Sequence, residues 1–222
     1  MSRFFKESGL SHPGLDGYCK SHTKPQDPLL AELFRDTYVN VYHPRRSSDP
    51  SMGKFLEMVV SMVRPFAVLE IGTFTGYGTL SMAAALQNGA TIDTIEINDE
   101  LAVRAREWFD RSPQKKRINL HIGDALQILP LPDKRFDLAF IDGDKDQYID
   151  YYDAVMGNMN PGGFIIADNT LWGGKVFEEN PASGDHFTRG VQRFNRHVMD
   201  DPRVDNLLLP LFDGITLIRL KP

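Results

Sequence analysis

Three side chains with oxygen donors stand directly after two short apolar runs. Asp142 follows the run 136–141, and Asp168 and Asn169 follow the run 164–167. Carboxylate and amide oxygens are the ligands that hard cations such as Mg²⁺ and Mn²⁺ prefer, with some positions left open for water or substrate. Each place could also be an ordinary turn, because Asp, Asn and Gly favour turns. Two such turns on neighbouring strands favour a metal site.

The segments around these residues predict how they come together. Residues 136–141 and 164–167 have the length and apolar character of buried strands, and residues 146–159 between them have helical spacing. We expect a Pro-Gly-Gly turn at 161–163, before the second strand. A strand, a crossover helix and a strand form a right-handed parallel unit, so both strand ends reach the carboxyl edge of the sheet. Open α/β sheets bind their ligands at that edge.

A glycine-rich turn joins a predicted strand, 66–71, to a predicted helix, 77–86. It contains Gly72, Gly76 and Gly78, which do not have the G-x-G-x-x-G spacing of dinucleotide folds. The next predicted strand, 91–97, carries Glu96, and an acidic residue at this distance from the turn can bind the two hydroxyls of a ribose. The alternative is a charge at the N-terminus of the following helix. The turn and the acid together favour the ribose role.

Composition limits the class of protein. The 222 residues fit one α/β domain, and the apolar and charged fractions of 41% and 25% are ordinary for a globular chain. The net charge of −5 argues against a protein that coats nucleic acid. A single cysteine, Cys19, excludes an internal disulfide and fits a reducing compartment. No stretch reaches ~18 apolar residues, so we expect a cytoplasmic protein with no membrane span.

The N-terminal third predicts an arm and a cap. Residues 1–26 lack clear periodicity, and we expect them to pack on the body or on a second subunit. Helices are predicted to begin at Asp27-Pro28 and at Asp49-Pro50, since an acidic N-cap followed by Pro favours a helix start. We therefore divide the chain into an arm with cap helices, 1–65, and a core, 66–222. The core ends in a predicted hairpin of strands 204–211 and 214–220.

Five motifs extend the argument to a family: VLEIGTFTGYGTLSMA, IEIN, FDLAFIDGDKDQY, GGFIIADNTLWGG and DGITL. They resemble the caffeoyl-coenzyme A type of cation-dependent O-methyltransferase, which is related to catechol O-methyltransferase. The resemblance covers about residue 27 to the end. It implies the class I S-adenosylmethionine (SAM) methyltransferase fold, which is Rossmann-like. That fold has a seven-stranded, mostly parallel sheet, a C-terminal antiparallel hairpin and helices on both faces. It also implies a homodimer.

The resemblance assigns roles to individual residues. It implies metal ligands at Asp142, Asp168 and Asn169 for Mg²⁺, Mn²⁺ or Ca²⁺, and it makes Lys145 the candidate general base. It implies SAM contacts at Ser48, Glu70, Gly72, Thr73, Gly78, Glu96, Ala125 and Asp144. Two positions depart from the family pattern: the family often has Ser in place of Gly78, and plant members have Asn in place of Gly173.

The implied reaction transfers a methyl group from SAM to a hydroxyl of a small catechol-like diol. A divalent ion chelated by two vicinal hydroxyls stabilises the ionised oxygen. A nearby cation and partial burial favour the neutral amine of Lys145, which would act as base. The alternative for Lys145 is a surface salt bridge to Asp144 or Asp146.

Three aromatic residues, Tyr148, Trp172 and Phe177, could flank a planar acceptor, although core packing explains Tyr148 equally well. Other functions also stay open. One is methylation of a hydroxylated nucleoside in tRNA, for which Arg45-Arg46 and the run 115–117 would supply basic contacts. Another is a non-catalytic SAM-binding protein, against which the Asp-Asp-Asn-Lys set argues. A dinucleotide oxidoreductase is disfavoured by the glycine spacing.

Overall fold

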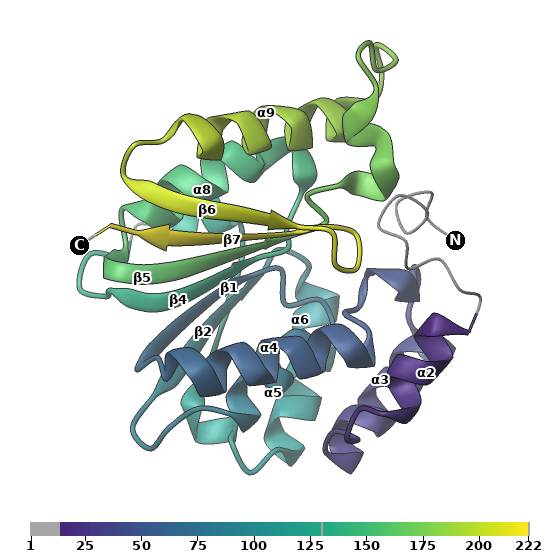
Figure 1. Ribbon diagram of the computed structural model, residues 1–222. Coiled ribbons are helices and arrows are strands. Elements are labelled where there is room, and N and C mark those ends of the chain that lie inside the picture. The colour runs from purple at the N-terminus through teal and green to yellow at the C-terminus, as the bar shows by residue number, and fades with distance from the viewer. Residues whose placement is uncertain (1–13, 130, 222) are drawn as a thin grey trace.

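The computed structural model describes residues 14–129 and 131–221, and Figure 1 shows a sheet between two layers of helices. The seven strands have the order β3-β2-β1-β4-β5-β7-β6, and β7 runs antiparallel to both of its neighbours. Their bounds are β1 Ala67–Ile71, β2 Thr91–Glu96, β3 Ile118–Ile122, β4 Phe136–Ile141, β5 Met159–Asp168, β6 Val204–Leu209 and β7 Ile215–Leu220. The expected mostly parallel sheet with a C-terminal antiparallel hairpin is confirmed.

The described helices lie on both faces of this sheet. The α-helices are α2 Leu15–Ser21, α3 Pro28–Asn40, α4 Pro50–Val63, α5 Tyr77–Ala84, α6 Asp99–Arg111, α7 Ala125–Ile128, α8 Tyr148–Met156 and α9 His186–Asp200. Short 3-10 turns are η1 Pro44–Arg46, η2 Lys115–Arg117, η3 Lys145–Gln147 and η4 Trp172–Phe177. None of the described helices combines the length and the apolar character that a membrane-spanning segment needs.

The core is divided by the sheet. Helices α8 and α9 cover one face, and α4 and α5 cover the other (Figure 1). The apolar residues of α7 pack with those of α8 and α9. Helix α3 joins α5 and α6 in a third cluster around Leu33 and Phe109. The parallel strands are therefore covered on both faces, which explains why β4 reads as a nearly continuous apolar run.

The N-terminal helices begin where the sequence predicts. The side chain of Asp27 accepts a hydrogen bond from N of Leu29, and that of Asp49 accepts one from N of Met52. These caps satisfy backbone donors that a helix start otherwise leaves unpaired. The predicted arm is partly helical, because residues 15–21 form α2. This helix buries none of its side chains. Residues 1–13 of the predicted arm lie outside the described residues, and the division of the chain at residue 65 stays a prediction.

The predicted Pro-Gly-Gly turn is wrong. Helix α8 ends at Met156, and β5 begins at Met159, so residues 161–163 lie inside the strand. Gly162 has a φ of +76°, and the pairing of β5 with β4 shifts register between Phe136 and Leu138. A bulge therefore absorbs the residues that the sequence pattern assigns to a turn.

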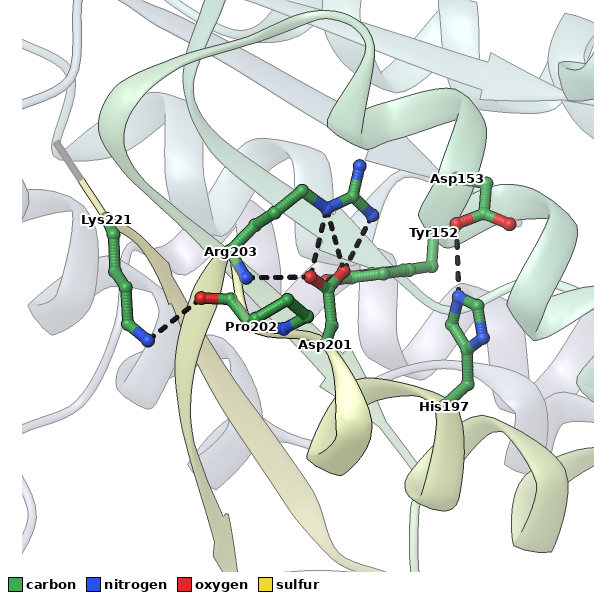
Figure 2. Close-up of polar contacts among 7 residues, drawn as sticks. All are labelled: Tyr152, Asp153, His197, Asp201, Pro202, Arg203 and Lys221. Carbon is green, nitrogen blue, oxygen red and sulfur yellow. Dashed lines mark hydrogen bonds and ion pairs between the residues drawn. The ribbon is translucent and has the colours of Figure 1, made fainter.

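The C-terminal end of α9 is fastened to α8 and to the start of β6, as Figure 2 shows. The hydroxyl of Tyr152 donates to Asp201 over 2.9 Å, and the guanidinium of Arg203 binds both oxygens of the same carboxylate. Nε2 of His197 lies 3.1 Å from Oδ1 of Asp153. The Arg203 contact holds the pKa of Asp201 well below its usual range. These contacts fix the helix whose opposite end reaches the candidate site.

Candidate functional site

The two acidic strand ends meet as the sequence predicts. Strands β4 and β5 are parallel neighbours in which Ile141 pairs with Ala167, so Asp142 and Asp168 follow at the same edge. Asp168 is buried, and its carboxyl lies close enough to Asp142 to feel that charge. Burial, and next the neighbouring charge of Asp142, raise the pKa of Asp168 well above its usual range. Two adjacent carboxylates in a poorly hydrated place favour a bound cation.

Asn169 follows Asp168 directly, so it lies at the same edge of the sheet. Its φ of +57° is left-handed, a conformation that Asn adopts more readily than most residues. Its backbone N donates to Oδ1 of Asp168 over 2.6 Å. Within the part of the chain that the structure describes, its side chain has no hydrogen-bond partner. The amide oxygen is therefore available to a ligand.

The chemistry of this donor set fits a hard divalent cation. No cluster of three or more His, Cys, Asp or Glu side chains with a metal-holding arrangement occurs in residues 14–129 and 131–221. The set at this edge contains two carboxylates and one amide, so it is of a different kind from such a cluster. All three donors are oxygen atoms, as Mg²⁺ and Mn²⁺ prefer.

Lys145 lies inside this cluster and not on the surface. Its Nζ donates to Oδ1 of Asp142 over 2.7 Å and to the carbonyl oxygen of Gly143 over 3.2 Å. The ammonium also lies 4.9 Å from the centre of the Tyr148 ring, and the residue is only 8% exposed. The predicted alternative, a surface salt bridge to Asp144 or Asp146, is wrong about both partner and place.

A narrow pocket opens beside Asp142. Its lining includes five of the residues that the sequence assigns to SAM, namely Ser48, Glu70, Gly72, Thr73 and Gly78. Asp142 lines it as well, so the pocket and the acidic cluster share a wall. Gly72 has a φ of +100°, and a Cβ there would overlap the backbone oxygen of Asp142. Only glycine lets the ends of β1 and β4 approach this closely.

Glu70 is the buried acid of this pocket. Its Oε2 accepts hydrogen bonds from the hydroxyls of Thr79 and Thr94, and burial raises its pKa to about 8. A Cβ on Gly78 would lie 2.7 Å from Oε1 of Glu70 and 3.8 Å from Oγ of Ser48. The missing side chain of Gly78 therefore leaves Oε1 facing the pocket.

Glu96 ends β2 beside the same turn. Its Oε2 accepts from N of Phe74 over 2.7 Å, and its Oε1 accepts from N of Asn98 over 2.9 Å. Burial raises the pKa of its carboxyl, and the charge of Arg46 opposes that change. The carboxylate thus holds the glycine-rich turn in place and keeps lone pairs for two hydroxyl donors.

Glu96 and two other predicted SAM residues stand apart from the pocket lining. Ala125 begins α7 and is buried, whereas Asp144 is exposed and accepts from N of Asp146. Burial raises the pKa of Tyr151 to about 12, and the charges of Asp144 and Asp124 add to that change. Both segments therefore lie near the Tyr151 hydroxyl, and the roles of Ala125 and Asp144 stay predictions.

The aromatic candidates separate into core and surface. Tyr148 is fully buried, and its hydroxyl donates to the carbonyl oxygen of Asp168 over 3.0 Å, so core packing is the right interpretation. The ring of Trp172 meets that of Phe187 edge to face, with centroids 5.9 Å apart. Phe177 is 65% exposed. The Trp172 and Phe187 pair is the best candidate for one wall of an acceptor site.

Sequence reasoning gave no role to Asp213, which lies half-buried at the tip of the β6–β7 hairpin. Its charge raises the pKa of Asp168, and that of Lys145 acts on it in turn. The motif DGITL contains it, but Asp-Gly between two strands reads simply as a turn. Phe187 was also missed, since a lone aromatic at a helix start carries no signal of its partner.

Comparisons with known proteins give a consistent result. A family model described as O-methyltransferase matches residues 20–221. The catechol O-methyltransferase of Niastella koreensis is 33% identical over 204 residues, which cover 88% of this chain and 90% of that protein. Caffeoyl-CoA O-methyltransferase 2 of Zea mays is 32% identical over 207 residues, covering 88% and 78% respectively. The SAH-bound methyltransferase PaMTH1 of Podospora anserina has a TM-score of 0.88 at 27% identity, covering 100% of this chain and 99% of that one.

Proposed function

The chain belongs to the O-methyltransferase family and is a SAM-dependent O-methyltransferase, and we propose that it methylates a hydroxyl of a small catechol-like diol with a divalent cation. One observation carries the proposal. Asp142 lines the narrow pocket that contains Glu70 and Gly72, and the same carboxylate binds Lys145. The methyl donor, the cation and a proton acceptor would therefore meet around a single side chain.

The residues at the strand ends fall into a cation-binding set and a SAM-binding set. Asp142, Asp168 and Asn169 would hold the cation, which when bound would lower the pKa of an acceptor hydroxyl. Glu96 would bind the ribose hydroxyls, and Glu70, which lines the pocket, would bind the amino group of the methionine end. Ser48, Thr73, Gly78, Ala125 and Asp144 stay candidates for the remaining SAM contacts.

Lys145 would take the proton of the attacking hydroxyl. Lys145 is buried beside the acidic cluster. It could therefore accept the proton of the hydroxyl without bulk water entering the site. The edge-to-face pair of Trp172 and Phe187 would align a planar acceptor with the methyl donor. Holding both reactants in line contributes much of the rate of such a transfer.

Removal of the metal tests the proposal. After dialysis against EDTA, methyl transfer from labelled SAM to catechol should stop, and added Mg²⁺ or Mn²⁺ should restore it; Ca²⁺ is the third ion to test. The variant Asp168→Ala should lose turnover and still bind SAM, because its carboxylate does not line the cofactor pocket. Full activity in excess EDTA would refute the metal role.

A tRNA acceptor is less well supported than a small diol. The basic run 115–117 precedes β3, so it lies at the amino edge of the sheet, opposite the site. The guanidinium of Arg117 is already occupied by the carbonyl oxygens of Leu86 and Gln87 and by Asn88. Arg46 lines the cofactor pocket. A labelled-SAM assay on unmodified tRNA separates the two acceptors.

We further propose a homodimer in the cytoplasm. Met58 and Met62 on α4 are 54% and 70% exposed, and Leu207 on the edge strand β6 is 55% exposed. Large apolar side chains in this number are typical of association surfaces. The exposed thiol of Cys19 suits a reducing compartment. A mass of 25.1 kDa from light scattering at micromolar concentration would contradict the dimer.

A further inference from the structure

The tip of the β6–β7 hairpin is joined to the segment that follows Asp168 and Asn169. The backbone N of Thr170 donates to the carbonyl oxygen of Gly214 over 3.0 Å, and N of Leu171 donates to that of Asp213 over 2.9 Å. Gly214 has a φ of +93°, and a Cβ there would overlap the backbone N of Leu171. The hairpin tip and this segment therefore form one rigid unit.

The side chain of Asp213 extends this unit by one more contact. Its Oδ1 accepts a hydrogen bond from N of Gly173. Gly173 and Gly174 have φ values of +61° and +83°, and Trp172 before them has +47°. Three successive left-handed residues, one of them not glycine, cost free energy unless their surroundings hold them. Among the described residues, Asp213 supplies the side-chain hydrogen bond within this turn.

The turn determines where the Trp172 ring lies. From the start of the turn the ring reaches Phe187 on α9, and a Cβ on Gly173 or on Gly174 would meet no atom within 4 Å. Side-chain packing therefore does not hold the two glycines on the side where a Cβ would stand. Backbone hydrogen bonds from N of Trp172 to Asn169 and from N of Gly174 to Leu171 close the turn on itself. The hydrogen bond from Gly173 to Asp213 is the side-chain contact that ties this turn to the hairpin tip.

We propose that Asp213 is a positioning residue, which holds Trp172 at a fixed place relative to Asp168 and Asn169 by accepting the Gly173 N–H. This rests on the proposed function, in which Trp172 forms a wall of the acceptor site. Asp213 acts through its acceptor oxygen, so its charge is not needed. It neither binds the cation nor receives the substrate proton.

The test compares Asp213→Ala, which removes the acceptor, with Asp213→Asn, which keeps an acceptor oxygen and removes the charge. Asp205→Ala, at an exposed position of β6, is the matched control. A Trp108→Phe background leaves Trp172 as the one tryptophan of the chain. Acrylamide quenching then reports on the Trp172 ring without metal or acceptor. We expect stronger quenching in Asp213→Ala, and wild-type quenching in Asp213→Asn and in the control.

Kinetics supply the second measurement. Asp213→Ala should raise KM for the acceptor about tenfold, the scale for losing a hydrogen bond to a charged group. Its Kd for SAM should stay unchanged, and Asp213→Asn should behave like the wild type. If Asp213→Asn is as impaired as Asp213→Ala, the charge matters and the proposal is wrong. Wild-type quenching in Asp213→Ala would also overturn it.

Two further outcomes remain decisive. If Asp213→Ala does not fold, Asp213→Asn still carries the test, because a tenfold change in its acceptor KM contradicts a role for the acceptor oxygen alone. If no diol is methylated at all, the proposed function fails, whereas the quenching series still confirms or refutes the positioning of Trp172. The two failures are therefore distinguishable.

Discussion

Nζ of Lys145 lies 2.7 Å from Oδ1 of Asp142, which lines the cofactor pocket. An ammonium in this position neutralises one carboxylate of an acidic pair. A divalent cation at the same carboxylates would repel this ammonium and compete with it for Asp142. The contact therefore links the charge of the cluster to the availability of a base.

Lys145→Met should lower turnover roughly 10²–10⁴-fold, the usual contribution of a positioned acid or base. Met keeps most of the length of the side chain and removes the amine, so SAM affinity should change little. The measurement is kcat with catechol and with nitrocatechol, whose hydroxyl ionises readily. We expect the loss to shrink with nitrocatechol, because an ionised oxygen needs no base.

Two results would change the role of Lys145. An equal loss with both acceptors would mean that the lysine orients the substrate or balances charge. Wild-type turnover with both would mean that its bond to Asp142 is purely structural.

Glu96→Ala should weaken SAM binding by roughly 1–3 kcal/mol, since the glycine-rich turn beside the pocket loses the charged acceptor proposed for the ribose hydroxyls. The turn should also loosen, because Glu96 holds N of Phe74 and N of Asn98. Calorimetric titration measures the change, with Asp99→Ala on the exposed start of α6 as the control for charge. Tight binding of NAD in place of SAM would sink the assignment of this pocket.

Glu70 should make the stability of the cofactor-free protein depend on pH. Burial raises its pKa from 4.5 to about 8. Between these values the folded chain keeps a proton that the unfolded chain releases, so stability falls as pH rises. The contribution of the neutral carboxyl is complete below about pH 4.5 and is lost as pH passes about 8.

Urea unfolding of the wild type and of Glu70→Gln, from pH 5 to pH 8, measures this effect. Gln cannot ionise, so the difference in the free energy of unfolding isolates Glu70 from other titrating groups. The wild type should lose up to about 1.4 kcal/mol per pH unit relative to the variant. Parallel profiles would show that Glu70 does not keep its proton.

The fold could be predicted where local signals are complete. Strand β4 has the predicted bounds, and helices α3 and α4 begin at the predicted residues, because Asp27 and Asp49 cap them. Strand β5 could not be predicted in full, since its Pro-Gly-Gly segment has the composition of a turn. Pairing with β4 overrides that local preference, and no sequence window shows the pairing.

The candidate site also contains residues that could be predicted from the sequence and residues that could not. The oxygen donors at 142 and 168–169 and the turn around Gly72 were predicted, because each is a short motif at a strand end. The partner of Lys145 and the position of Asp213 could not be predicted. Both depend on which segments meet in space, and Asp213 meets Gly173 from forty residues away. The roles of these residues stay predictions until the variants are measured.

Gly190→Ala should disturb the packing of α9 against η3, the turn that contains Lys145. A Cβ on Gly190 would overlap the carbonyl oxygen of Lys145 and lie 2.8 Å from Cα of Asp146. Both are backbone atoms, so either α9 or the turn η3 must shift. Overpacking of this kind costs roughly 1–3 kcal/mol, which should outweigh the gain of up to ~1 kcal/mol from replacing a helical glycine.

Gly17→Ala is the matched control, because Gly17 is also helical and a Cβ there meets nothing within 4 Å. Urea midpoints should fall for Gly190→Ala and should not fall for Gly17→Ala. Turnover of Gly190→Ala should fall as well, even where the protein stays folded, since the turn that carries Lys145 is displaced. A stable Gly190→Ala with wild-type turnover would show that α9 can move without disturbing Lys145. The helix would then be a cover for the sheet and not a support for the site.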